Sequence, residues 1–109
     1  MNIEVINPAN GKTVKEVALM SNEKVHELID LAAEVQGTWK TNHVDYRATK
    51  MQKAANILME NQEVYARLMT EEMGKPIQQS RSEIEKCAWV CRYYAENIKI
   101  FLQKEIIKT

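Results

Sequence analysis

The most constraining feature of the sequence is a run of apolar residues, spaced four and three apart, in its last third. The run is Ile84, Ala88, Cys91, Ala95, Ile98 and Leu102. This spacing follows the period of an α-helix and places the six side chains on one face. It predicts a long last helix over about residues 76–103. The small residues in the run favour close packing on several neighbours.

The same period runs through the preceding region, from about residue 21. It predicts three shorter helices, separated by breaks near residues 37–43, at Asn61 and at Gly74. The first helix carries the stripe Val25, Leu28, Ile29, Ala32, Val35 and Trp39. Ser21 or Asn22 can cap this helix, and Asp45 can cap the next. Gly74 suits the left-handed residue that ends a helix, and Pro76 suits the first position of another.

Residues 1–20 have a different pattern, with β-forming residues on both sides of an Asn10-Gly11 turn signal. We expect a hairpin with strands near residues 3–7 and 13–19. Two strands alone are marginally stable in water, so this hairpin needs another surface. With only 3 Gly and 2 Pro, a many-stranded sandwich or barrel is disfavoured. The predicted fold class is therefore mainly α, an N-terminal β-hairpin followed by four helices.

Charge and cysteine content limit the classes of function. Lys plus Arg and Asp plus Glu number 15 each, which argues against a nucleic-acid binder that neutralises phosphates. No apolar run approaches the length of a membrane span, and the N-terminus does not resemble a signal peptide, so we expect a cytoplasmic protein. Cys87 and Cys91, four residues apart on a predicted helix, are expected to be buried, reduced thiols. A redox role for this pair would require exposure and a lowered thiol pKa.

A search for chemistry finds no Gly-rich phosphate loop, and neither His26 nor His43 has metal ligands at the usual spacing. Trp39 ends the first stripe and is expected to anchor a core or an interface. Trp89 lies off the main stripe of the last helix, so it would face a second surface or line a cavity. Lys86 and Arg92 flank the same helix. They are either surface charges or cations that attract an anionic ligand.

Four stretches, in order, resemble the N-terminal part of the aldehyde dehydrogenase superfamily. The first is Asn7-Pro8-Ala9-Asn10-Gly11-Lys12, similar to the family's opening turn. The second is Trp39 followed by Arg47, ahead of Ala54, Ala55 and Leu58. The third is Leu68-Met69-Thr70-Glu71-Glu72-Met73-Gly74-Lys75-Pro76, and the fourth runs from Ser82-Glu83-Ile84 to Cys91-Arg92-Tyr93-Tyr94-Ala95-Glu96. Together with Glu85-Lys86-Cys87-Ala88-Trp89, the last two look most like the succinate-semialdehyde dehydrogenase branch.

The resemblance implies that residues 1–109 are the N-terminal segment of an α/β enzyme that oxidises an aldehyde, here succinate semialdehyde, with NAD or NADP. In the family a cysteine thiolate attacks the aldehyde, hydride passes to the nicotinamide, and a glutamate activates water. The family chain is several times longer, so this nucleophile and this base are expected beyond Thr109. Cys87 and Cys91 do not match the nucleophile, which lies in a loop after a Gly-Gln pair.

The resemblance therefore predicts a chain that is an N-terminal fragment, inactive alone and without bound cofactor. The candidates for lining the substrate entrance are Lys86, Trp89 and Arg92, where a cation would attract a distal carboxylate. Apolar stripes separated from their partners favour association, so we also expect a homo-oligomer. The alternative is a non-catalytic helical module for interaction or oligomerisation.

Overall fold

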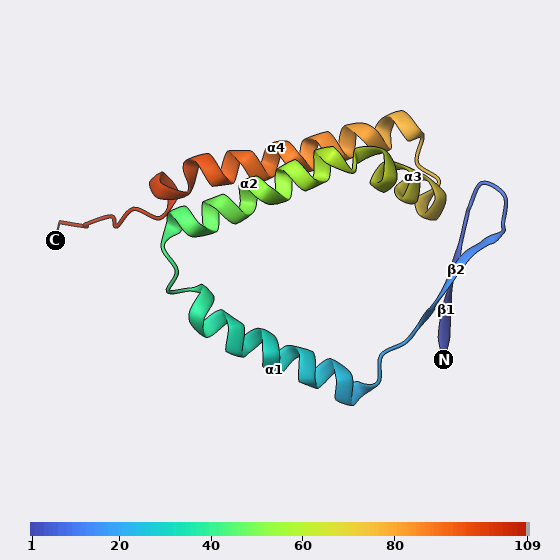
Figure 1. Ribbon diagram of the computed structural model, residues 1–109, viewed down its shortest axis with the longest axis horizontal. Coiled ribbons are helices and arrows are strands. Elements are labelled where there is room, and N and C mark those ends of the chain that lie inside the picture. The colour runs from blue at the N-terminus through green and yellow to red at the C-terminus, as the bar shows by residue number, and fades with distance from the viewer. Residues whose placement is uncertain (109) are drawn as a thin grey trace.

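A computed structural model describes residues 1–108 of the chain. It contains a two-stranded hairpin followed by four helices, which confirms the predicted fold class (Figure 1). The elements are β1 (Asn2–Ile6), β2 (Thr13–Ala18), α1 (Asn22–Trp39), α2 (Val44–Glu60), α3 (Gln62–Met73) and α4 (Ile77–Phe101). The long last helix thus begins and ends close to the residues that the apolar period indicated.

The hairpin is antiparallel and has one polar and one mainly apolar face. Ile3 pairs with Val17 and Val5 with Lys15, whereas Glu4 and Glu16 lie opposite each other on the other face. The turn closes where the Gly11 amide donates to the Asn7 carbonyl, at 2.8 Å. Gly11 has a φ of 70°, the left-handed conformation that the Asn-Gly signal predicts.

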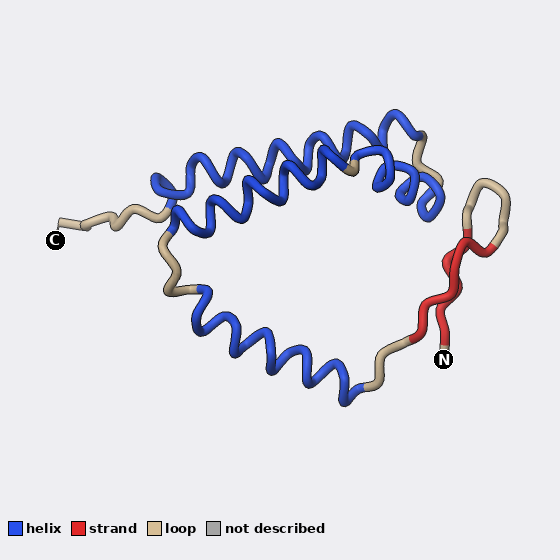
Figure 2. The backbone as a smooth tube through the Cα atoms, in the orientation of Figure 1, coloured by secondary structure: helices blue, strands red, loops and turns tan. Residues whose placement is uncertain are grey.

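Helices α2, α3 and α4 form the packed part of the molecule. Figure 2 shows α2 and α4 side by side along their length, and α3 lies against the first part of α4. The buried apolar side chains are Ala55, Ala66, Ile84, Ala88 and Ala95. Four of these five are alanines, so the helix backbones approach closely, as the small residues of the α4 stripe predicted.

Helix boundaries follow local chemistry, with two small corrections to the sequence prediction. Ser21 accepts from the Lys24 amide and caps α1. The N-cap of α2 is His43 rather than Asp45, because the His43 ring nitrogen accepts from the Asp45 amide. Gly74 ends α3 with a φ of 71°, as expected, whereas Pro76 is the N-cap of α4 and not its first helical residue.

Helix α1 lies apart from the other helices. It crosses the opposite side of the molecule from α2 and α4, joined to its neighbours by loops (Figure 1). All of its residues are exposed, including the whole predicted apolar stripe. Trp39 is 36% exposed and contacts only the edge of Tyr46 among the aromatic residues described, at a 6.1 Å ring separation. Trp39 therefore anchors no core within residues 1–108, because no element lies over the stripe, and the alternative that it anchors an interface stays a prediction.

The hairpin touches the rest of the chain at the end of α3. The Lys15 ammonium pairs with the Glu72 carboxylate at 2.5 Å. A Cβ built on Gly74 would lie only 2.7 Å from Pro8 Cγ, so only glycine permits this approach. These two contacts hold the hairpin loop beside the turn that leads into α4.

Candidate functional site

The candidate site lies on α4, whose position is fixed at both ends by polar contacts. Near its start, Arg81 donates from Nε and Nη2 to the two Glu63 carboxylate oxygens of α3, at 2.8 and 2.9 Å. Near its end, the Lys99 ammonium lies 2.8 Å from the Asp45 carboxylate of α2. The hydrogen bond from Lys99 lowers the pKa of Asp45. Both ends of α4 are thus held against neighbouring helices by charge-assisted hydrogen bonds.

The buried side of α4 contains one polar contact. Ser80 is fully buried, and its hydroxyl lies 2.9 Å from the Thr70 hydroxyl of α3. The contact gives the buried Ser80 hydroxyl a hydrogen-bond partner. This contact fixes the rotation of the first turns of α4, and with it the direction of the opposite, exposed face.

Two of the three predicted entrance residues, Lys86 and Trp89, lie on that exposed face. The Lys86 side chain is exposed and forms no ion pair within residues 1–108. Trp89 is 62% exposed. At a helical rotation of about 100° per residue, both point away from the face that packs on α2. Lys86 and Trp89 are thus an unengaged cation and an uncovered aromatic ring on adjacent turns.

Arg92, the third predicted residue, points elsewhere. It is half-buried, and its Nη2 donates to the Asn56 side-chain oxygen of α2 at 3.4 Å. The structure therefore separates Arg92, which lies along the contact between α2 and α4, from the other two residues.

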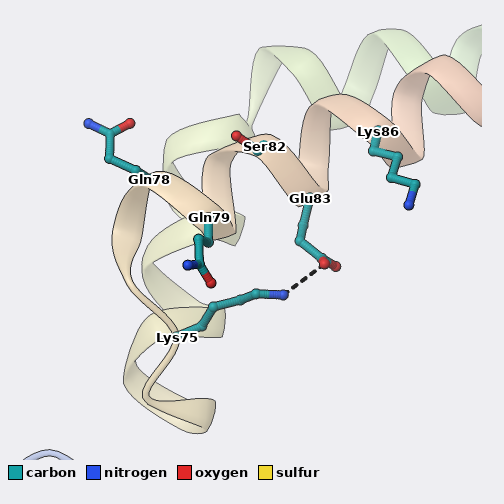
Figure 3. A pocket seen from close by; sticks show the side chains of 6 residues that line it. All are labelled: Lys75, Gln78, Gln79, Ser82, Glu83 and Lys86. Atoms are coloured by element: carbon teal, nitrogen blue, oxygen red, sulfur yellow. Dashed lines mark ion pairs between the residues drawn. The ribbon is translucent and has the colours of Figure 1, made fainter.

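A surface depression of about 400 Å³ adjoins Lys86. Its lining residues are Lys75, Gln78, Gln79, Ser82, Glu83 and Lys86. Figure 3 shows the Lys75 side chain reaching from the turn before α4 to Glu83, with a 2.7 Å ion pair, while Lys86 lies one turn further along. The hydrogen bond from Lys75, its charge and the charge of Lys86 lower the pKa of Glu83. Since Lys75 is paired, Lys86 is the cation free to meet an incoming anion.

Beyond Trp89 the exposed face becomes aromatic. Tyr93 lies 6.0 Å from Trp89, 5.5 Å from Tyr94 and 6.0 Å from Phe101, measured between ring centroids. Two neighbours of the predicted site residues were not included in the predicted site: Lys75, which lines the same depression as Lys86, and Tyr93, which lies beside Trp89. The spacing of four between Trp89 and Tyr93 was the available signal, because it places both rings on one helix face.

The cysteines differ from the sequence expectation. Both are free thiols, but Cys87 is exposed and Cys91 only half-buried, so the prediction of two buried thiols is wrong. The cause is that Cys87 lies at the edge of the packed face of α4, where no helix of residues 1–108 covers it. In the described part of the chain no three His, Cys, Asp or Glu side chains cluster to hold a metal. None of the helices described is both long and apolar enough to cross a membrane.

Comparison with known proteins identifies the class to which this arrangement belongs. The sequence model of the Aldehyde dehydrogenase family matches residues 1–109, so the chain belongs to the aldehyde dehydrogenase family. It is 39% identical, over its whole length, to a Synechocystis protein named "probable succinate-semialdehyde dehydrogenase [NADP(+)]". It is 35% identical, over 92% of its length, to the succinate semialdehyde dehydrogenase Sad of Escherichia coli. Both names agree with the predicted branch.

Solved structures agree on the fold. A succinic semialdehyde dehydrogenase from Streptococcus pyogenes, in complex with NADP+, superposes over 97% of the chain with a TM-score of 0.92 and 25% identity. An E. coli NADP-dependent enzyme does so over 99%, with a TM-score of 0.89 and 33% identity. The chain spans only about a quarter of these relatives, 24% of the Synechocystis protein and 22% of Sad.

Proposed function

We propose that this chain is the N-terminal region of an NAD(P)-dependent aldehyde dehydrogenase that oxidises succinate semialdehyde to the dicarboxylic acid. The observation that carries the proposal is the match of the whole chain to a succinate-semialdehyde dehydrogenase at 39% identity. The overall reaction removes a hydride and a proton and adds water oxygen to the carbonyl carbon. The nicotinamide, when bound, accepts the hydride. The nucleophilic cysteine and the glutamate base belong to the part of the fold that this chain does not span, so residues 1–109 alone are inactive.

In this proposal Lys86 and Trp89 lie at the substrate entrance and select for a distal carboxylate. Lys86 is an exposed cation without an ion-pair partner in the described chain, and Trp89 supplies an adjacent apolar wall. The named relatives support a substrate with a carboxylate, because they include glutarate-semialdehyde dehydrogenases as well as succinate-semialdehyde dehydrogenases. Arg92 remains a candidate, with its guanidinium already engaged by Asn56.

The proposal extends to the cofactor, the assembly and the compartment. Relatives are named for NADP(+) or for NAD(P)+, so the cofactor is NADP or NAD, with its contacts outside residues 1–109. The complete enzyme is proposed to be a homo-oligomer. Free thiols at Cys87 and Cys91 suit a reducing cytoplasm.

A chimeric enzyme tests the proposed function. Residues 1–109 replace the matching N-terminal region of E. coli Sad, and NAD(P)H formation is followed with succinate semialdehyde. The chimera should retain activity within about tenfold of Sad, because helices of the same fold leave the catalytic groups in place. A folded, soluble chimera without activity would overturn the proposal and favour the alternative of a non-catalytic helical module.

Lys86→Ala in the active chimera tests the entrance. We expect KM for succinate semialdehyde to rise about threefold to tenfold, the effect of losing roughly 1 kcal/mol of charge attraction near water. KM for butanal, which lacks the carboxylate, should not change. Lys53→Ala is the matched control, since Lys53 is an exposed lysine of α2. An equal rise for both aldehydes would remove Lys86 from the entrance.

A further inference from the structure

The depression beside Lys86 has a simple charge composition. Within residues 1–108 its charged lining residues are two cations, Lys75 and Lys86, and one anion, Glu83 (Figure 3). The rest of the lining is neutral: Gln78, Gln79 and Ser82. The depression therefore has a net charge of one positive unit, although it contains two lysines.

The two lysines have different surroundings, and Lys75 is the restrained one. Its backbone lies between Gly74, with a φ of 71°, and Pro76, with a φ of −55° fixed by its ring. Its side chain is 27% exposed, and its ammonium lies 2.7 Å from a Glu83 carboxylate oxygen. Exposed ion pairs gain little because both side chains lose conformational freedom. Partial burial already restricts Lys75, so this pair forms at a smaller entropic cost and occupies the Lys75 ammonium.

Glu83 also acts on the second lysine, which is exposed and forms no ion pair in the described chain. Lys86 follows Glu83 by three positions, nearly one helical turn. The hydrogen bond from Lys75, the charge of Lys75 and the charge of Lys86 all lower the pKa of Glu83. Glu83 therefore stays ionised near neutral pH, and its negative charge opposes the attraction of any anion that approaches Lys86.

We propose that Glu83 determines the specificity of the substrate entrance by neutralising Lys75, so that one net positive charge meets the substrate. This proposal rests on the proposed function, which places Lys86 at the entrance. A single net charge suits an aldehyde with one distal carboxylate. It disfavours an aldehyde with a doubly charged phosphate, because Glu83 repels a dianion about twice as strongly. Glu83 acts through Lys75 and through its own charge, so it is a positioning residue and not a catalytic one.

Removing the anion in the active chimera with Sad is the first test. Glu83→Gln frees Lys75 and adds one positive charge to the depression. KM for succinate semialdehyde should fall about threefold, the effect of one nearby charge in water-like surroundings, and kcat should stay within about twofold. KM for butanal, which has no charge, should not change. For glyceraldehyde 3-phosphate, a dianion at pH 8, kcat/KM should rise about tenfold, roughly the square of the effect on a single charge.

A double variant separates charge from structure. Lys75→Gln alone should raise KM for succinate semialdehyde about threefold, because it leaves Glu83 unpaired beside Lys86. Lys75→Gln combined with Glu83→Gln lacks the ion pair but restores one net positive charge. Its KM should return to within about 1.5-fold of the parent chimera. A purely structural ion pair predicts the opposite, since the double variant has lost both partners.

Glu96→Gln is the matched control. Glu96 is an exposed glutamate of α4, 13 positions from Glu83 and therefore about 20 Å along the helix. That separation exceeds the Debye length of about 10 Å at 0.1 M salt, so this variant should leave KM unchanged. In 1 M NaCl, where the Debye length is about 3 Å, the differences among the Glu83 and Lys75 variants should largely disappear.

Three results would overturn the inference. One is a KM for succinate semialdehyde that changes no more in Glu83→Gln than in Glu96→Gln. Another is an equal change for butanal. The last is a double variant that differs from the parent chimera as much as the single variants do. Any of these results in an active chimera leaves the proposed function standing. An inactive parent chimera would overturn the proposed function, and this inference with it.

Discussion

The α2–α4 bundle and the segment made of the hairpin and α1 have similar amphipathic sequences but different surroundings. In the bundle, Ala88 and Ala95 of α4 are buried against its neighbours. In α1, residues with the same helical spacing, such as Leu28 and Val35, are 41% and 53% exposed. The comparison shows that the apolar period determines a helix and its apolar face, but not what covers that face. The bundle is covered by its own helices, whereas nothing in residues 1–108 covers α1.

The largest contrast should come from removing one apolar side chain in each region. Ile84 is 5% exposed and Ile29 58% exposed. Ile84→Ala should lower the free energy of unfolding by about 2–5 kcal/mol, because it leaves a cavity between packed helices. Ile29→Ala should cost less than about 0.5 kcal/mol in the isolated chain. If urea unfolding showed the same decrease in the free energy of unfolding for both variants, α1 would be packed in the isolated chain.

The contact between the two regions can be broken at a glycine. Gly74 and Gly11 have φ angles of 71° and 70°, but only at Gly74 would an added Cβ meet Pro8. Each substitution to Ala should cost roughly 1–2 kcal/mol for the left-handed backbone. Gly74→Ala should in addition displace the hairpin loop, since the new Cβ would collide with Pro8. Faster tryptic cleavage after Lys15 in Gly74→Ala than in Gly11→Ala would confirm this, and equal rates would contradict it.

The hydroxyl contact between Ser80 and Thr70 gives a smaller effect, confined to the bundle. Ser80→Val should destabilise the chain by about 1–3 kcal/mol, because the Thr70 hydroxyl loses its partner 2.9 Å away. Thr49→Val is the control, since the Thr49 hydroxyl bonds a carbonyl of its own helix in an exposed position. Thermal unfolding should separate the two variants. A control that loses as much stability as Ser80→Val would argue against a role for this contact.

The smallest expected effect is the pH dependence of the contact between α3 and α4. Hydrogen bonds from Arg81 and then Arg67 lower the pKa of Glu63 from 4.5 to about 2. A lowered folded-state pKa means that the ion pairs stabilise the bundle above about pH 4.5, and that this stabilisation is lost as pH falls toward 2. Glu63→Gln should flatten the melting temperature over that interval. An unchanged slope would show that other carboxylates are responsible.

Much of the fold could be predicted because it depends on local chemistry. The apolar run from Ile84 to Leu102 predicted the long helix α4. Gly11 and Gly74 adopt the left-handed conformations that the sequence predicts for them. A core position for Trp39 is not found within residues 1–108, because burial depends on a neighbouring surface, which the local period does not describe; the interface alternative stays a prediction. The N-cap of α2 was missed since His43 can accept a hydrogen bond through its ring nitrogen, a use less common than an Asp cap.

The candidate site was only partly predictable for a related reason. Lys86 and Trp89 could be selected as residues off the main stripe of α4, and they lie on its exposed face. The engagement of Arg92 by Asn56, which is 36 positions earlier in the chain, depends on how α2 and α4 pack. Sequence spacing along one helix does not contain this information.

Amide hydrogen exchange on the purified chain tests the central claim, which is that no other part of residues 1–108 covers α1. Mass spectrometry of peptides from each helix would measure it. The account predicts that amides within residues 22–39 exchange much faster than those in the middle of α4. It also predicts that the same amides are protected in the chimera with Sad, in which the rest of the fold is present. Protection of α1 equal to that of α4 in the chain alone, as a monomer by light scattering, would contradict the account.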